Sequence, residues 1–310
     1  MKVTIIILNW NRLKDTLECL ESLKEMSLRD CRLSVLVVDN ASSDNSVTEI
    51  NKFLNSKSNN NNKKITWKLI KTDENLGFAG GNNFGISYSL EESPDYLILL
   101  NNDTLVDKNT LNGLLDAAKD DPDAAIISPK IYFAKGFEFH KNRYKKNELG
   151  KVIWYEGGII DWNDIYGNNN GVDEVDNGQF NKTTDTDFAT GACMLLNCVA
   201  IRKVGMFDEK YFMYFEDVDL SQRMKKHGWK VLFTSQAKLW HKVAQSSGVG
   251  SELNDYFITR NRLLFAFRYA SIRTKFAIFR ESLRLFIKGR KWQKKGVEDF
   301  YFSNFGKGSW

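Results

Sequence analysis

Residues 3–11 read VTIIILNWN and residues 33–44 read LSVLVVDNASSD, and these two stretches decide the fold. Each is a β-branched apolar run that stops at polar residues, which is typical of a buried strand. After the first, residues 14–26 place leucines at helical spacing, and after the second, residues 41–44 (Ala-Ser-Ser-Asp) can cap a helix. Continuous apolar strands that alternate with amphipathic helices predict a parallel sheet covered on both faces.

Further units of this kind continue along the chain. We predict strands at 65–71 and 96–100 and helices at 80–90 and 111–118. Residues 133–188 are rich in Gly, Asn, Asp and aromatic residues without a helical period, so we expect loops and short antiparallel strands that form the acceptor side. A helix at 217–227 and a strand at 230–234 follow, and the C-terminal tail is expected to be helical.

Polar side chains follow the predicted strands at the point where each strand ends. Asn9, Asp39 and residues 101–103 (Asn-Asn-Asp) all occupy such positions. Open α/β sheets bind ligands beyond the carboxyl ends of their strands. We therefore expect one crevice, rich in amides and carboxylates, to collect these residues.

The composition is that of a globular protein: 310 residues, 42% of them hydrophobic and 27% charged, can bury a full core. The four cysteines show no CxxC spacing, which predicts free thiols in a reducing cytoplasm. The first apolar run is too short for a signal peptide, and no run reaches the roughly 18 residues of a spanning helix. We expect a cytoplasmic protein with at most peripheral membrane contact.

Residues 255–310 differ in charge from the rest of the chain. They hold 13 Lys and Arg against four Asp and Glu, whereas residues 1–254 hold 31 against 35. A basic helical segment with interleaved aromatic residues indicates nucleic-acid binding or docking to the anionic inner face of a membrane, the alternative being a solvated basic face. Because the strand-end crevice is acidic and rich in amides, we predict no nucleic-acid binding.

Asp103 is a candidate metal ligand because it directly follows a buried strand. A carboxylate there can hold a divalent cation against a diphosphate. Capping of the next helix is the alternative role, although Asp107 lies nearer to that helix. His241 also follows a predicted strand and would add an imidazole ligand, but a lone histidine is more often structural.

The densest acidic cluster, Glu216, Asp217 and Asp219, follows an aromatic run at 211–215. An apolar wall beside a carboxyl group raises its pKa, which suits a general base. The alternative is that all three acids stabilise the N-terminus of a helix through its dipole.

Two glycine-containing segments are candidates for close backbone approach to a ligand. Asn75 begins a segment that includes Gly80 and joins a strand to a helix, and either ligand contact or a tight turn would require its glycines. The spacing is not GxGxxG, which disfavours a nicotinamide enzyme. Gly191 and Ala192 precede another apolar strand, where the backbone can approach a substrate.

Seven motifs carry a resemblance to a known family. In order they are VTIIILNWN (3–11), VLVVDNASSD (35–44), ENLGFAGGNN (74–83), YLILLNNDT (96–104), FATGACMLL (188–196), FDEKYFMYFEDVDLSQRMKKHGWKV (207–231) and LWHK (239–242). Together they resemble the inverting glycosyltransferases of family 2, and more narrowly the rhamnosyltransferase-like bacterial members.

The resemblance runs from residue 3 to about residue 262 and implies a GT-A fold. This is an α/β fold with a mixed, mostly parallel central sheet and helices on both faces. We expect a GT-A domain at 1–254, divided into a nucleotide-sugar-binding half at 1–110 and an acceptor and catalytic half at 111–254. A basic helical C-terminal extension at 255–310 would follow.

On the donor side, the family pattern implies that Asp39 pairs with the pyrimidine base and that Asn9 and Trp10 line its pocket. Asn75 and Gly80 fall in the family's glycine loop and are expected to contact the donor. The Arg that many relatives carry in this loop is replaced here by Asn82.

At the metal, Asn101, Asn102 and Asp103 stand where the family has its DxD motif, which makes Asp103 the metal-binding member. Asn101 replaces the first Asp, so that position keeps hydrogen bonding and loses a charge. His241 matches a histidine that coordinates the metal in related enzymes. The implied cofactor is Mn²⁺ or Mg²⁺.

On the catalytic side, Glu216 and Asp217 match the family's ED motif, whose Asp is the general base. Gly191 and Ala192 are expected near the acceptor. Arg260 is a candidate for contact with an acceptor phosphate, and a basic helical surface is its alternative role.

The resulting hypothesis is an inverting enzyme that moves a sugar to a glycan or lipid-linked acceptor, with rhamnose from dTDP-rhamnose favoured over a UDP-sugar. Two other classes stay open. One is a sugar-nucleotide-binding protein without turnover, and the other is a nucleotidyltransferase that releases pyrophosphate.

Overall fold

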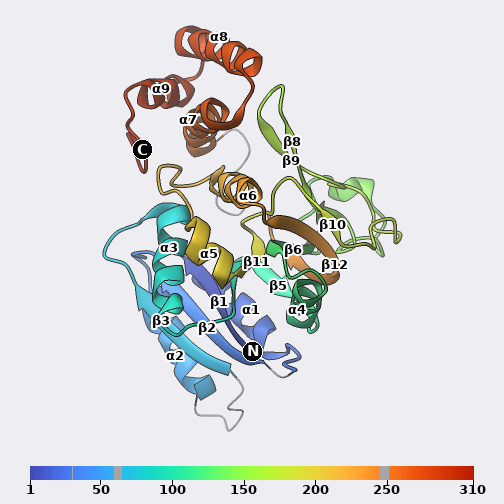
Figure 1. Ribbon diagram of the computed structural model, residues 1–310. Helices are drawn as coiled ribbons and strands as arrows, with labels where there is room; N and C mark the ends of the chain where they lie inside the picture. Colours follow the sequence, from blue (N-terminus) through green and yellow to red (C-terminus); the bar gives the residue numbers. More distant parts are fainter. Residues whose placement is uncertain (30, 59–64, 244–250) are drawn as a thin grey trace.

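The computed structural model describes residues 1–29, 31–58, 65–243 and 251–310 of the chain. Its centre is a mixed sheet with strand order β10-β12-β6-β11-β4-β1-β2-β3, in which β5 also pairs with β12 and β7 with β6 (Figure 1). The strands of this sheet are β1 (Lys2–Asn9), β2 (Arg32–Asp39), β3 (Ile65–Lys71), β4 (Tyr96–Asn101), β5 (Thr104–Val106), β6 (Ala124–Phe133), β7 (Ile153–Tyr155), β10 (Thr184–Asp185), β11 (Cys193–Asn197) and β12 (Lys230–His241).

The N-terminal strands β3, β2, β1 and β4 pair in parallel, as the alternation of strands and helices predicts. In this register Asn9 lies opposite Asp39, and Leu8 lies opposite Asn101. The pairing therefore brings the polar strand ends to one edge of the sheet. Strand β11 runs antiparallel between β4 and β6 and joins this half to the rest.

Helices cover both faces of the sheet, so the expected α/β fold is confirmed (Figure 1). Alternate residues of β1 show the two layers, because Ile5 and Ile7 belong to one buried cluster and Ile6 to another. The first cluster includes residues of α1, α2 and α4, and the second includes residues of α3, α5 and α6. These helices are α1 (Leu13–Lys24), α2 (Ser46–Ser58), α3 (Gly77–Leu90), α4 (Thr110–Asp120), α5 (Cys198–Val204) and α6 (Glu216–Lys226).

Strand β12 is longer than the predicted 230–234. The polar residues Ser235 and Gln236, which end the apolar pattern, lie in an irregularity of the pairing between Thr234 and Lys238. A bulge lets the strand continue beyond such a break. In the extension, residues 238–241 continue to pair with β6 and residues 239–241 also pair with β5, and the strand ends at His241.

The irregular region 133–188 contains short strands, as expected. Besides β7 and β10 it forms the antiparallel hairpin of β8 (Gly158–Asp161) and β9 (Tyr166–Asn169), and the short 3₁₀ helix η1 (Lys141–Arg143). Phe188 at its end belongs to the main hydrophobic core. This region therefore packs on the sheet while its turns remain at the surface.

The C-terminal tail is helical, with α7 (Glu252–Tyr269), α8 (Ile272–Lys288) and α9 (Lys291–Tyr301) (Figure 1). Helix α7 contributes Leu263, Phe265 and Ala266 to the main core. Among the helices described, none is both long and apolar enough to cross a membrane. All four cysteines are free thiols.

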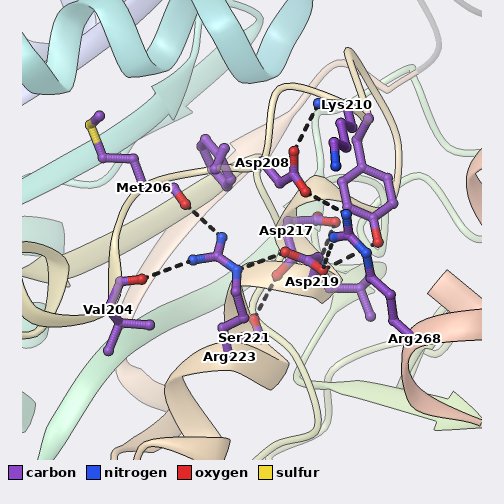
Figure 2. A network of polar contacts seen from close by, with 12 residues as sticks. Val204, Met206, Asp208, Lys210, Asp217, Asp219, Ser221, Arg223 and Arg268 are labelled. Atoms are coloured by element: carbon purple, nitrogen blue, oxygen red, sulfur yellow. Dashed lines mark hydrogen bonds and ion pairs between the residues drawn. The ribbon is translucent and has the colours of Figure 1, made fainter. Parts of the chain in front are cut away.

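A buried carboxylate, Asp219, joins α6 to α7 (Figure 2). Its side chain is fully buried and accepts from Arg223 Nε at 2.8 Å and from an Arg268 guanidinium nitrogen at 3.0 Å. The hydroxyls of Tyr211 and Tyr269 also donate to it, at 3.2 and 2.8 Å. Four donors from three segments thus fix the first turn of α6.

Replacing Asp219 with Ala should lower the free energy of unfolding by about 3–5 kcal/mol, because two arginines would lose their buried counter-charge. Urea denaturation followed by circular dichroism measures the change. Glu49→Gln, which breaks the exposed Glu49–Lys52 pair, should change stability by no more than about 0.5 kcal/mol. Equal effects of the two substitutions would contradict a stabilising role for this network.

Candidate active site

A cavity of about 430 Å³ lies where the ends of β4 and β12 meet the N-terminus of α6. It is lined by Asp103, His241, Glu216, Asp217 and Gly191, which come from four separate parts of the sequence. Its size and mixture of apolar walls with a few polar groups are typical of a small-molecule site. The apolar walls are formed by Phe78, Phe139, Trp154, Tyr166, Phe188, Met213, Tyr214, Phe215, Val218, Val243 and Ile258.

The pairing of β5 with β12 brings Asp103 next to His241. His241 lies opposite Thr104 in the ladder, and the Lys242 amide donates to the Asp103 carbonyl oxygen at 2.9 Å. As a result, His241 Nε2 lies 2.9 Å from Asp103 Oδ1. The indole of Trp154 packs edge-on against the imidazole, with ring centroids 4.6 Å apart. Backbone and ring contacts therefore fix the position of both side chains.

The chemistry of this pair fits a divalent cation. Asp103 Oδ1 is buried and lies 2.9 Å from His241 Nε2 without the geometry of a hydrogen bond, and the buried His241 Nδ1 has no hydrogen-bond partner among the described residues. Buried polar atoms are normally satisfied, so this incomplete pairing of two ligand-type side chains is unusual. Within the described part of the chain, no three His, Cys, Asp or Glu side chains gather as a metal site. A cation bound here would thus need oxygen ligands from water or from a substrate.

Asp217 lies in the first turn of α6 and is partly exposed in the cavity. Its carboxylate accepts from the Gly191 amide at 2.9 Å and from the Val218 amide at 2.8 Å. A β-carbon on Gly191 would meet the Phe78 ring at 3.0 Å, so glycine permits this close approach. The next residue, Ala192, accepts from the Asn101 amide at 2.9 Å, which ties the segment to the end of β4.

Burial raises the pKa of both carboxyl groups in this turn. For Asp217, burial raises the pKa above its ordinary value, and the Gly191 and Val218 amides act against that rise. For Glu216, burial raises the pKa well above the ordinary range, and repulsion by Asp217 adds to it. Glu216 Oε2 also has no hydrogen-bond partner among the described residues. Burial thus disfavours ionisation of Glu216 more strongly than that of Asp217.

The turn before Asp217 has an unusual backbone conformation. Phe212, Tyr214 and Phe215 have φ angles of 62°, 66° and 72°, a region that large side chains rarely adopt. The side-chain amide of Asn261 on α7 donates to the carbonyl oxygens of Tyr211, Met213 and Tyr214, at 2.8, 2.7 and 2.9 Å. One side chain of α7 thus holds the turn that precedes Asp217.

The glycine segment at the start of α3 supports the same turn. Gly77 has a φ of 72°, and a β-carbon there would lie 2.6 Å from Phe212. The Ala79 amide donates to the Phe212 carbonyl oxygen at 3.0 Å. At Gly77, the close approach that a glycine permits is therefore an approach to Phe212 of the protein itself.

Arg260 does not meet an acceptor phosphate, which corrects the expectation from sequence. Its side chain is fully buried, and a guanidinium nitrogen donates to the carbonyl oxygens of Lys210 and Tyr211, each at 3.1 Å. The guanidinium also lies 5.0 Å from the Phe257 ring centre. The buried guanidinium therefore attaches α7 to the segment at 210–211. The sequence alone does not show whether a basic residue on a helix is buried or exposed.

The donor-side residues at the strand ends are joined by hydrogen bonds. Asn9 Nδ2 donates to Asp39 Oδ2 at 2.8 Å, and Asn9 Oδ1 accepts from Thr16 Oγ1 at 2.7 Å. Thr16 in turn accepts from Asn102 Nδ2 at 2.9 Å. Asp39 also accepts from the Ser42 amide at 2.9 Å. This chain of contacts links the ends of β1, β2 and β4.

The other donor-side candidates lie apart from the cavity lining. Trp10 is half-exposed at the end of β1. Asn75 accepts from Asn40 Nδ2 at 2.9 Å and from the Gly77 amide at 2.8 Å. Gly80 is buried in α3, where a β-carbon would meet Leu76 at 2.9 Å. Packing inside the protein therefore gives one reason for a glycine at this position, and the expected contact of Gly80 with the donor stays a prediction.

Sequence reasoning did not identify the aromatic wall of the cavity. Phe139, Trp154 and Tyr166 come from the region 133–188, which was expected only in general terms to form the acceptor side. Nor was Asn261 expected to hold the turn before Asp217. The one available signal was the presence of large aromatic residues in a segment otherwise rich in Gly and Asn.

Comparisons with known proteins identify the family of the chain. The family model described as "Glycosyl transferase family 2" matches residues 4–205. The chain is 27% identical to an N-acetylglucosaminyl-diphospho-decaprenol L-rhamnosyltransferase of Mycobacterium tuberculosis, across 70% of this chain and 68% of that protein. It is 25% identical to the low-salt glycan biosynthesis hexosyltransferase Agl10 of Haloferax volcanii, across 51% of this chain and 46% of that one.

Solved structures share the fold. A mannosyltransferase from Pyrobaculum calidifontis, in complex with GDP-Man and Mn²⁺, aligns with a TM-score of 0.57 at 14% identity, covering 97% of this chain and 74% of that one. GalNAc-T7 with UDP, GalNAc and Mn²⁺ aligns with a TM-score of 0.60 at 15% identity, covering 98% and 57%. The match to the family model over most of the chain, and these GT-A neighbours, show that the protein is a GT-A glycosyltransferase belonging to family 2.

Proposed function

We propose that this enzyme transfers its sugar with inversion and that Asp217 is the general base. The observation that carries the proposal is a single cavity lined both by Asp217 and by the Asp103–His241 pair. An acceptor hydroxyl bound near Gly191 would give its proton to Asp217 while its oxygen attacks the anomeric carbon. The bond from that carbon to the nucleotide oxygen breaks in the same step, so one displacement inverts the configuration.

Glu216 is proposed to support the base in its neutral form. Its raised pKa favours the protonated form beside Asp217, which would reduce the repulsion between two negative charges in the turn. The aromatic walls exclude water from the attacking hydroxyl, which protects the donor from hydrolysis. Together these features favour transfer over water attack.

On the donor side, we propose that Asp103 and His241 hold Mn²⁺ or Mg²⁺, with Asn101 and Asn102 contacting the donor by hydrogen bonds. Both structural neighbours named above were solved with Mn²⁺. A cation bound there would neutralise negative charge on the departing diphosphate. Asp39 is proposed to pair with the pyrimidine base.

For the substrates, we propose rhamnose from dTDP-rhamnose, or else a UDP-sugar, and a glycan or lipid-linked acceptor. The name of the mycobacterial relative, a rhamnosyltransferase that acts on a diphospho-decaprenol lipid, supports this choice. Asp39 is compatible with either pyrimidine base, so the donor is the open part of the proposal. A thermal-shift panel of nucleotide sugars with Mn²⁺ would decide it.

Asp217→Asn should lower kcat by roughly 10²–10⁴-fold, because the amide cannot accept the acceptor proton. Donor affinity should stay within a few-fold of wild type. Product formation with a radiolabelled nucleotide sugar measures the rate, and calorimetry measures donor binding. The matched control is Asp116→Asn on the exposed face of α4, which should leave the rate unchanged. Near wild-type transfer by Asp217→Asn would remove Asp217 from the role of base.

Asp103→Asn should weaken both Mn²⁺ binding and metal-dependent nucleotide binding by about tenfold or more, because the Asp103–His241 pair loses its carboxylate. Titration with UDP and with dTDP, each with and without Mn²⁺, measures the loss. The control is Asp107→Asn, which should bind Mn²⁺ and nucleotides as wild type does. The Asp107 carboxylate accepts a hydrogen bond from the Asn109 amide in the next turn. If Asp103→Asn kept the full metal dependence, the cation would have to bind elsewhere.

As the pH is lowered, the rate should begin to fall at a higher pH than it would if the base were an ordinary aspartate. Asp217 acts as a base only when ionised, and its raised pKa means that protonation begins earlier as pH decreases. The acidic limb of kcat/KM should therefore lie above pH 4, the approximate pKa of a free Asp. A profile that stays flat down to about pH 4 would argue against a base with a raised pKa.

A further inference from the structure

Helix α8 carries an exposed apolar stripe along its whole length. Ile272 is 87% exposed, Phe276 is 65% exposed and Ile287 is 68% exposed. Residues spaced three and four apart lie on one face of a helix, so the stripe is continuous. Its members are Ile272, Phe276, Phe279, Leu283, Phe286 and Ile287.

The opposite face holds α8 on the protein. Ile278 and Ser282 are buried, and Glu281 forms a two-pronged ion pair with Arg262 of α7, at 2.8 and 2.9 Å. Ser282 also shares a hydrogen bond with Tyr301 of α9 at 2.7 Å. The inner face therefore makes most of the contacts that attach the helix, and in the outer stripe Phe279, which is 36% exposed, adds an edge-on contact with Tyr301 of α9.

Basic side chains border the apolar stripe. Arg273, Arg280, Arg284 and Lys288 are exposed on α8, and Lys275 is partly exposed. The acidic residue of this helix, Glu281, faces α7 and is neutralised by Arg262. The outer face of α8 is therefore both apolar and positively charged, with no negative charge of its own.

We propose that α8 docks on an anionic lipid bilayer, with the apolar stripe inserted at the headgroup and acyl boundary and the arginines at the lipid phosphates. A helix with one apolar face and one strongly basic border is suited to lie in the plane of a membrane interface. Anionic headgroups attract each Lys or Arg near the surface. An anionic bilayer thus provides an apolar partner for the stripe and negative charges for the arginines on the same face of α8.

A second copy of the chain fits this face less well. Pairing two α8 stripes would bring two sets of arginines together without acidic partners, and like charges in contact oppose association. A spanning orientation does not suit the helix either, because α8 has 17 residues and carries charge along its length.

Docking at α8 would also orient the cavity. In Figure 1, α8 is the outermost helix at the end of the molecule opposite α2. Arg262, which anchors α8, also donates to the Asp164 carbonyl oxygen at 2.6 Å and lies 4.3 Å from the centre of the Tyr166 ring. Tyr166 lines the cavity. The membrane face and the cavity wall are therefore joined through one side chain, although docking itself does not depend on the proposed reaction.

The test is co-flotation of the full-length protein with vesicles. Wild type should float with phosphatidylcholine vesicles that contain about one third phosphatidylglycerol, and not with pure phosphatidylcholine, because the basic border needs anionic lipid. High salt should weaken the binding. Phe276→Ser with Leu283→Ser should lower the partition coefficient at least about tenfold, through loss of apolar insertion. Arg280→Gln with Arg284→Gln should lower it about 10- to 30-fold.

The matched control is Val199→Ser with Lys203→Gln, which makes the same kinds of change at exposed positions of α5 and should bind as wild type. Circular dichroism and thermal melting check that each variant is folded. Equal binding to neutral and anionic vesicles, no binding to either, or wild-type binding by the α8 variants would overturn the proposal. So would light scattering that shows a dimer which the Phe276→Ser, Leu283→Ser variant converts to monomer.

Discussion

Hydrogen bonds from α7 to the turn at 211–215 are the constraint on which the geometry of the site depends. The turn contains three residues in left-handed conformations and cannot close α6 by ordinary capping, since Phe215 offers no side-chain cap. Asn261 satisfies three of its carbonyl oxygens, Arg260 adds contacts to its first residues, and Asp219 anchors the helix that follows. Residues more than 40 positions downstream of Asp217 therefore determine where its carboxylate points.

The two sides of the cavity depend on different kinds of contact. The Asp103–His241 side is fixed by strand pairing, which specifies backbone positions through a regular ladder. The Asp217 side is fixed by individual polar contacts among α6, α7 and the turn. The segment before β11 connects the two sides, because Gly191 donates to the Asp217 carboxylate and Ala192 accepts from the Asn101 amide. A displacement of the Asp103–His241 side would therefore also displace the Asp217 side, and the reverse.

Much of the fold could be predicted from sequence because its signals are local. Buried strands ending at Asn9, Asp39 and Asn101 show their own pattern, and parallel pairing then brings them to one edge. The partners of Asp219 could not be predicted, because they come from residues 211 to 269 and depend on tertiary packing. The same holds for Arg260, since the pattern of a basic residue on a helix is the same whether the side chain is buried or exposed.

The left-handed aromatic turn has a consequence for thermal tolerance. A bulky residue in such a conformation destabilises the folded state by about 1–3 kcal/mol. Three such residues are a large cost, because the net free energy of unfolding of most domains is only about 5–15 kcal/mol. Glycine at Phe212 or Tyr214 would relieve strain, yet it would also loosen the segment before Asp217. Substitutions in this turn that raise thermal stability would thus lower the rate of catalysis. Stabilising substitutions in α2 or α4 would avoid that loss.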